Sequence, residues 1–177
     1  MPITTFDAVL INGSVGTGKT TTAEGLGAEL RQRSIPGAVI DVDWLRRSWP
    51  APLGDPFQTT LALGNMQAIA SNFRRAGARV LVVAAVVETV DDLERNAVAL
   101  ASKRLLHVRL AATPDAVLSR LARRHDGDDA ALQWHARRHP ELARTLDRAG
   151  FTAELLIDTT HKPTTDVVQE IVATIVS

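Results

Sequence analysis

Residues 13–20 read Gly13-Ser14-Val15-Gly16-Thr17-Gly18-Lys19-Thr20 and match the whole pattern G-x-x-x-x-G-K-[ST]. This match is the strongest indication of the fold in the sequence. An apolar run at residues 6–12 precedes it and has the length and composition of a buried strand. A helical pattern follows over residues 19–33. Glycines in such a turn let the backbone point its N–H groups inward, where they and the helix N-terminus hold a polyphosphate. The sequence therefore predicts that this loop binds a nucleotide.

Two side chains of the loop have chemical tasks of their own. Lys19 can reach the β- and γ-phosphates, and the Thr20 hydroxyl can ligate magnesium. ATP and Mg²⁺ are therefore the predicted cofactors. The predicted nucleotide-binding residues are Gly13, Ser14, Val15, Gly16, Thr17, Gly18, Lys19, Thr20 and Thr21.

The rest of the chain alternates between strand and helix patterns. Further strands are expected at residues 38–40, 79–87, 105–110 and 155–157. Helices are expected at residues 57–76 and 91–101, from Thr113-Pro114 onward, and after a cap at Thr164 or Thr165. This order predicts an α/β fold with a five-stranded, mostly parallel sheet covered on both faces. Ligands of such sheets bind at the carboxyl ends of the strands.

Composition narrows the class of protein. At 177 residues the chain fits a single domain, residues 1–177. Its formal net charge of zero argues against dedicated nucleic-acid binding, and its lack of cysteine excludes disulfides. No stretch approaches the roughly 20 apolar residues of a membrane span, so no membrane partner is expected. With no signal-peptide pattern at the N-terminus, a cytoplasmic location is expected.

An acidic pair follows the second expected strand. Asp41 and Asp43 are two residues apart, so on an extended chain both carboxylates would point to the same side. The alternative is a solvated strand end or a helix cap for residues 44–47. A GTPase is not expected, because the guanine-reading N-K-x-D is missing and the D-x-x-G at residues 147–150 falls in a helical region.

The chain resembles the P-loop small-molecule kinases in three features. These are the phosphate loop, the D-x-D-x-L-R at residues 41–46, and the helix at residues 65–76 that runs into Gly77 and an apolar strand. The likeness is greatest to adenylylsulfate kinases and weaker to shikimate, gluconate and chloramphenicol phosphotransferase types. It implies a three-layer P-loop NTPase fold with a helical lid. It also implies an ATP- and magnesium-dependent phosphotransferase whose partner is a small-molecule hydroxyl acceptor.

The resemblance also assigns roles to residues. Asp43 matches the carboxylate that takes the acceptor proton, Asp41 the one that supports magnesium, and Arg46 the group that grips the acceptor. In adenylylsulfate kinases a Ser-Pro pair follows the third strand. Here Val86-Val87-Glu88-Thr89 stands there, which argues against an adenylylsulfate acceptor. Glu88 is either a carboxylate that assists magnesium or a neighbour of a helix cap.

An arginine-rich segment at residues 120–148 occupies the position of the lid in small kinases. Arg120 and Arg124 are four apart and can share one helix face, so they join Lys19 and Asp43 as predicted catalytic residues. The alternative is a solvated helical face paired with the acidic cluster.

Three minor interpretations concern aromatic residues, histidines and assembly. Trp44, Trp49 and Phe57 either line a pocket or, as such residues more often do, pack in the core. His135 and His139 have the spacing of a zinc pair but show no third ligand. A homodimer is compatible with the sequence.

Two functions stay open. One is the kinase; the other is a regulatory module that hydrolyses ATP slowly and signals through lid closure. The paired acids after the second strand favour the kinase.

Overall fold

The computed structural model describes residues 4–149 and 152–176. Its strands are β1 (Ala8–Gly13), β2 (Gly37–Asp41), β3 (Val80–Ala84), β4 (Leu105–Ala111) and β5 (Leu155–Asp158). Its helices are α1 (Lys19–Gln32), α2 (Val42–Leu45), α3 (Thr59–Arg75), α4 (Val90–Ala99), α5 (Pro114–Arg124), α6 (Asp129–Asp147) and α7 (Thr164–Ile175).

The five strands form one sheet in the order β2-β3-β1-β4-β5, and each neighbouring pair is parallel. The chain first passes from β1 to one side of the sheet and later crosses back to β4 on the other side. The carboxyl end of β1 therefore lies at the point where the strand order reverses, which is where parallel α/β sheets bind ligands. The α/β fold expected from the sequence is confirmed.

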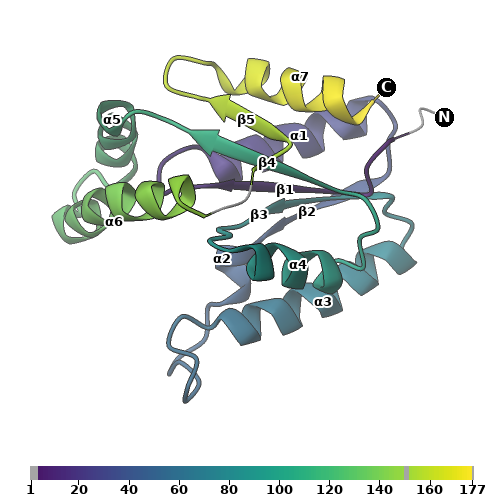
Figure 1. Ribbon diagram of the computed structural model, residues 1–177, viewed down its shortest axis with the longest axis horizontal. Coiled ribbons are helices and arrows are strands. Elements are labelled where there is room, and N and C mark those ends of the chain that lie inside the picture. Colours follow the sequence, from purple (N-terminus) through teal and green to yellow (C-terminus); the bar gives the residue numbers. More distant parts are fainter. Residues whose placement is uncertain (1–3, 150–151, 177) are drawn as a thin grey trace.

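Helices cover both faces of the sheet, giving three layers (Figure 1). On one face α1 and α7 pack side by side over a core that includes Val9, Ile11, Leu26 and Ile171. On the other face α3 and α4 cover a second core. All five residues of β3 are buried, which explains its unbroken apolar and β-branched sequence.

The helices α5 and α6 stand apart from these layers, at the carboxyl ends of the strands (Figure 1). The second half of α6 is fixed to the body of the protein. Its residues His139, Leu142 and Leu146 are buried, and Arg109 of β4 donates a hydrogen bond of 3.0 Å to the carbonyl oxygen of Leu146. Of the segment predicted as a lid, residues 139–147 thus form a packed base.

Some expected boundaries differ from the structure for identifiable reasons. The third strand ends at Ala84 rather than Val87, because the Asn12 side chain accepts from the Val87 N–H and donates to its carbonyl oxygen in place of a neighbouring strand. The prediction that Thr164 or Thr165 caps the last helix is wrong. Both lie inside α7, and Pro163 is the residue before its first turn.

Candidate active site

The phosphate loop requires glycine at two positions for packing as well as for backbone conformation. Gly13, Gly16 and Gly18 have φ values of 152°, 77° and 97°. A Cβ on Gly13 would lie 2.7 Å from the Leu110 carbonyl oxygen, and one on Gly16 would lie 2.8 Å from Val117. The loop leads directly into the N-terminus of α1, where helices bind anions.

Lys19 folds back over this loop. Its Nζ donates hydrogen bonds to the carbonyl oxygens of Gly13 at 2.9 Å and Ser14 at 3.0 Å. Burial lowers the pKa of Lys19 to about 8, against the opposing effect of the carboxylates of Asp43 and Asp41. A polyphosphate in the loop would favour the charged form of this side chain.

Thr20 and Asp41 bring two oxygens together beside the loop. The Thr20 hydroxyl donates to Asp41 Oδ2 at 2.7 Å, and Asp41 Oδ1 accepts from the Asp43 backbone N–H at 2.9 Å. A hydroxyl and a carboxylate are oxygen ligands of the kind that Mg²⁺ prefers. The two residues therefore fit the magnesium site expected from the sequence.

The geometry assumed for the acidic pair is wrong. Asp41 is the last residue of β2, but Asp43 lies in the first turn of the short helix α2, so the two do not share an extended chain. Asp41 caps that helix, in keeping with the alternative of a helix cap. Both carboxylates still line the same cavity, together with Arg46, whose Nε is 3.8 Å from Asp43 Oδ1.

The two predicted lid arginines have different surroundings. Arg120 donates to the carbonyl oxygen of Gly16 at 3.3 Å and to the Thr159 hydroxyl at 3.2 Å, so it ties the phosphate loop to the segment after β5. Arg124 lines the cavity and makes no ion pair with any residue in the described ranges. Arg124 is thus the arginine of the two that is available to an anion.

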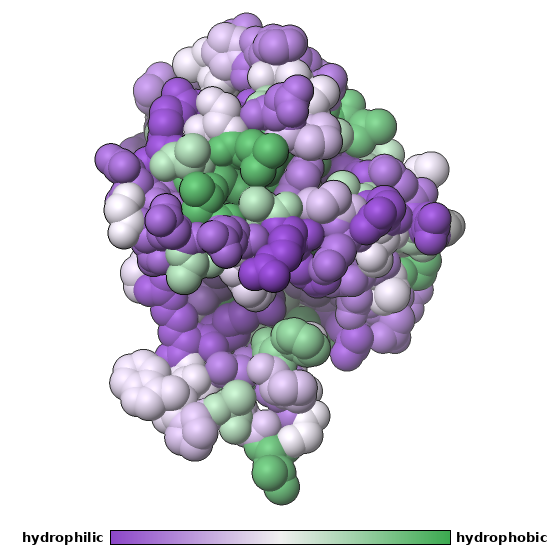
Figure 2. Space-filling view, turned by 90° about the vertical axis from the view of Figure 1, so that its left-hand side faces the viewer, coloured by the Kyte–Doolittle hydropathy of each residue, from purple (hydrophilic) through white to green (hydrophobic). Residues whose placement is uncertain are grey.

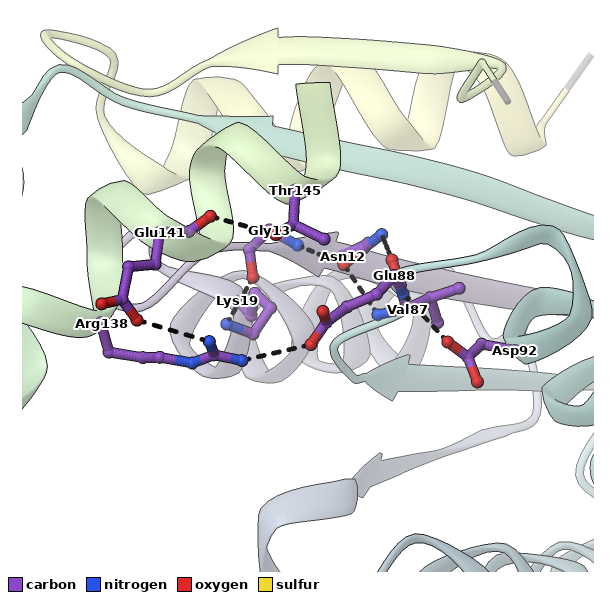
Figure 3. Close-up of polar contacts among 9 residues, drawn as sticks. All are labelled: Asn12, Gly13, Lys19, Val87, Glu88, Asp92, Arg138, Glu141 and Thr145. Carbon is purple, nitrogen blue, oxygen red and sulfur yellow. Dashed lines mark hydrogen bonds and ion pairs between the residues drawn. The ribbon is translucent and has the colours of Figure 1, made fainter. Parts of the chain in front are cut away.

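Glu88 and Arg138 form a bridge across the cavity. Arg138 Nη2 of α6 is 3.3 Å from Glu88 Oε1, and its Nη1 is 3.7 Å from Glu141 Oε2 (Figure 3). The Glu88 backbone N–H also donates to Asp92 at 3.3 Å, near the start of α4. Glu88 therefore precedes the capping residue of α4, Thr89, and also forms an ion pair with Arg138 of the lid segment.

Two buried polar residues have roles beside the phosphate loop that the sequence analysis did not assign. Asn12 Nδ2 donates to the Val87 carbonyl oxygen at 2.9 Å and lies 3.2 Å from His107 Nε2, so Asn12 links the end of β1 to β4 and to the segment after β3. His139 Nδ1 of α6 lies 2.8 Å from Ser14 Oγ and 3.2 Å from the Val15 carbonyl oxygen. Burial lowers the pKa of His139, so the neutral ring is favoured. For Asn12 the sequence offered one signal, a polar residue at the end of an apolar run. No feature of the sequence indicated that His139 contacts Ser14.

A cavity of about 1050 Å³ is lined by most of the residues predicted for the site, among them Lys19, Thr20, Asp41, Asp43, Arg46, Arg120 and Arg124. Figure 2 faces the carboxyl end of the sheet and shows a hollow between the body and a small protrusion, the loop between α2 and α3. Residues 15–21 of the phosphate loop line the cavity, whereas Gly13 and Ser14 lie behind that lining.

Of the two alternatives for Trp44, Trp49 and Phe57, the structure shows core packing for none and a place in the cavity lining for Trp44 and Phe57. Trp49 is 88% exposed on the protrusion, while Trp44 and Phe57 line the cavity at 65% and 77% exposure. Trp134 of α6 lines it as well.

The histidine spacing on α6 does not produce a metal site. His139 is bound to the phosphate loop, and the ring of His135 stacks on His125 with centroids 4.7 Å apart. Within the described ranges, no three metal-ligating side chains come together. No helix there has the length and hydropathy needed to cross a membrane.

No model of a known protein family matches the chain, and no curated protein matches it. Solved structures do. A gluconokinase from Sinorhizobium meliloti is 19% identical, with 94% of this chain and 90% of that chain covered and a TM-score of 0.62. An APS kinase from Mycobacterium tuberculosis, in complex with AMPPNP and APS, is 20% identical over 95% and 96% of the two chains, with a TM-score of 0.61.

A tunicamycin resistance protein from Deinococcus radiodurans is 25% identical, with 94% and 93% of the two chains covered and a TM-score of 0.60. The chain therefore has the P-loop NTPase α/β fold, and two of these three structural neighbours are small-molecule kinases. The resemblance to P-loop small-molecule kinases seen in the sequence is confirmed at the level of the fold.

Proposed function

We propose that this protein transfers the γ-phosphoryl group of ATP, with Mg²⁺, to a hydroxyl group of a small-molecule acceptor. The observation that carries the proposal is one cavity lined by the phosphate loop, by the Thr20–Asp41 pair and by Asp43. The absence of cysteine is compatible with a reducing cytoplasm, which we include in the proposal.

In this mechanism positioning and charge neutralisation matter more than covalent chemistry. Residues 13–21 hold the phosphates, and Lys19 releases its two carbonyl contacts to bind them. Arg124, which has no ion pair in the described ranges, offsets the charge that spreads over the transferred group. Thr20 and Asp41 would hold Mg²⁺, which supplies neutralisation of the β- and γ-phosphate charge when bound.

Asp43 is the proposed general base. Its carboxylate lines the cavity and lies close enough to Lys19 to oppose the lowering of that lysine's pKa by burial. An acceptor hydroxyl placed between Lys19 and Asp43 would face the γ-phosphate on one side and the Asp43 carboxylate on the other. Arg46 lines the cavity beside Asp43, and its guanidinium can donate to an acceptor oxygen.

The second candidate, a regulatory ATPase that signals through lid closure, is favoured by the bridge from Arg138 of α6 to Glu88. Both functions need the phosphate loop, but only the kinase needs Asp43 as a base.

The substitution Asp43→Asn separates the two functions. An amide cannot accept the hydroxyl proton, so acceptor-dependent turnover should fall by about 10²–10⁴-fold. Affinity for ATP should barely change, because Asp43 lies outside the phosphate loop. Single-turnover transfer and a nucleotide titration measure both quantities, with Asp91→Asn, an exposed acid outside the cavity, as the control. Full transfer by Asp43→Asn would rule out Asp43 as the base.

A further inference from the structure

The part of the cavity beside the phosphate loop offers unpaired cations. Lys19 donates to backbone carbonyl oxygens rather than to a carboxylate. Arg120 likewise contacts carbonyl oxygens and a hydroxyl, and Arg124 has no ion pair within the described ranges. Cationic side chains that are not paired with carboxylates can form charge-assisted hydrogen bonds with an anionic ligand such as a polyphosphate.

The acceptor part of the same cavity is arranged differently. Arg138 pairs with Glu88 at 3.3 Å, and Arg46 faces Asp43 at 3.8 Å. The Arg47 guanidinium lies over the Trp44 ring, 3.8 Å from its centroid. Two of these arginines already face carboxylates and the third lies over an aromatic ring, so an anionic acceptor that pairs with Arg46 or Arg138 would have to displace Asp43 or Glu88.

Aromatic side chains concentrate in this part. The chain has three tryptophans and four phenylalanines, and Trp44, Phe57 and Trp134 line the cavity. Their exposed fractions are 65%, 77% and 57%, although burial in the core is the usual fate of large apolar side chains. Exposed apolar side chains gathered at a cavity mark a place where an apolar ligand group binds. The Arg47–Trp44 stack adds a flat surface on which a ring can lie.

We infer that the acceptor is an uncharged hydroxyl compound that carries a flat apolar or aromatic group. The inference rests on the proposed kinase function for the placement of the hydroxyl at Asp43. The flat group contacts Trp44, Phe57 and Trp134, and a neutral oxygen of the acceptor accepts a hydrogen bond from Arg46. An acid of similar size is disfavoured, because the carboxylates of Asp43 and Glu88 repel it and already balance the charges of Arg46 and Arg138.

Three glycosides test the two properties separately by isothermal titration in the presence of AMPPNP and Mg²⁺. Phenyl β-D-glucoside is neutral and aromatic, phenyl β-D-glucuronide adds a carboxylate, and methyl β-D-glucoside lacks the ring. We expect the phenyl glucoside to bind at least about tenfold more tightly than either of the others. Equal or tighter binding of the glucuronide, equal binding of the methyl glucoside, or no measurable binding of the phenyl glucoside overturns the inference.

Two matched variants locate the contact. Trp44→Ala should reduce the affinity for phenyl β-D-glucoside by about tenfold, whereas Trp49→Ala, on the same protrusion but outside the cavity lining, should leave it unchanged. Equal losses in both variants, or none in Trp44→Ala, would contradict the placement. Because binding is measured without turnover, a failure of the kinase function shows separately, as selective binding without phosphoryl transfer.

Discussion

The protonation state of the Lys19 side chain is coupled to the binding of nucleotide. Its folded pKa of about 8 lies below the ordinary 10.5, so between these values the folded chain holds fewer protons than the unfolded chain. The free energy of unfolding therefore gains a contribution that rises with pH over this window. A polyphosphate reverses the preference, because it favours the ammonium form.

Affinity for AMPPNP and Mg²⁺ should accordingly fall as pH rises above about 8, by up to about tenfold per pH unit, with uptake of a proton on binding. Lys19→Met should bind more weakly and lose this pH dependence. Calorimetry in buffers of different ionisation enthalpy measures both effects, and Lys103→Ala, an exposed lysine, is the control. A pH dependence that survives in Lys19→Met would assign it to another group.

Single residues also show where sequence reasoning stopped. The tasks of Lys19 and Thr20 follow from a local motif, because their partners lie within the same loop or at the end of the next strand. His139 contacts Ser14 over a separation of 125 positions, and Asn12 contacts Val87 over 75. No periodicity or spacing encodes such long-range pairs.

At the scale of elements, α6 is the part that connects the lid segment to the phosphate loop. His139 holds Ser14 and Val15 from this helix, so the shape of the loop depends on where α6 packs. His139→Ala leaves these groups without a partner in a buried place, and unfolding should become easier by about 1–3 kcal/mol.

The same variant should weaken nucleotide binding by roughly tenfold, a loss equivalent to the net contribution of about one hydrogen bond. Arg137→Ala changes an exposed residue of the same helix and should leave both quantities unchanged. Urea unfolding and titration with AMPPNP test the pair. If His139→Ala is destabilised but binds AMPPNP with normal affinity, the contact of His139 with the phosphate loop serves stability alone.

Lid movement should be confined to part of the predicted segment. Residues 139–147 are anchored by His139, Leu142 and Leu146, whereas residues 122–138, which follow the buried Leu121, carry Arg124, Trp134 and Arg138 at the cavity. Binding of AMPPNP and Mg²⁺ should slow amide exchange over residues 122–138 and change it little over residues 139–147. Mass-resolved hydrogen exchange measures this. Slowing only in the phosphate loop, or equally along all of α6, would contradict a lid of this extent.

Element boundaries were predicted well where periodicity is strong and poorly where the site interrupts it. The apolar run at residues 79–87 looks like one strand, but β3 stops at Ala84, where Asn12 takes over the backbone groups of Val87. The helix α2 was missed because its four residues are too short for a periodic pattern, and this moved Asp43 off the expected strand.

For the whole molecule, the strand order accounts for the position of the site. The central strand β1 ends between β3 and β4, so the phosphate loop, the segment after β3 and the helix α5 all meet at one edge of the sheet. The alternation of strands and helices predicted this edge. It did not predict the acceptor side of the cavity, because the loop between α2 and α3 has no regular pattern that places its aromatic residues.

The most direct test of the kinase follows the γ-phosphoryl group of ATP by ³¹P NMR, with the whole protein, Mg²⁺ and a panel of hydroxylated metabolites, nucleosides and antibiotics, charged and neutral. The predicted result is a phosphate ester of an acceptor, formed together with ADP and lost in a folded Lys19→Ala variant but not in Lys103→Ala. Release of inorganic phosphate at one slow rate with every compound, and no ester, would contradict the kinase and favour the regulatory ATPase.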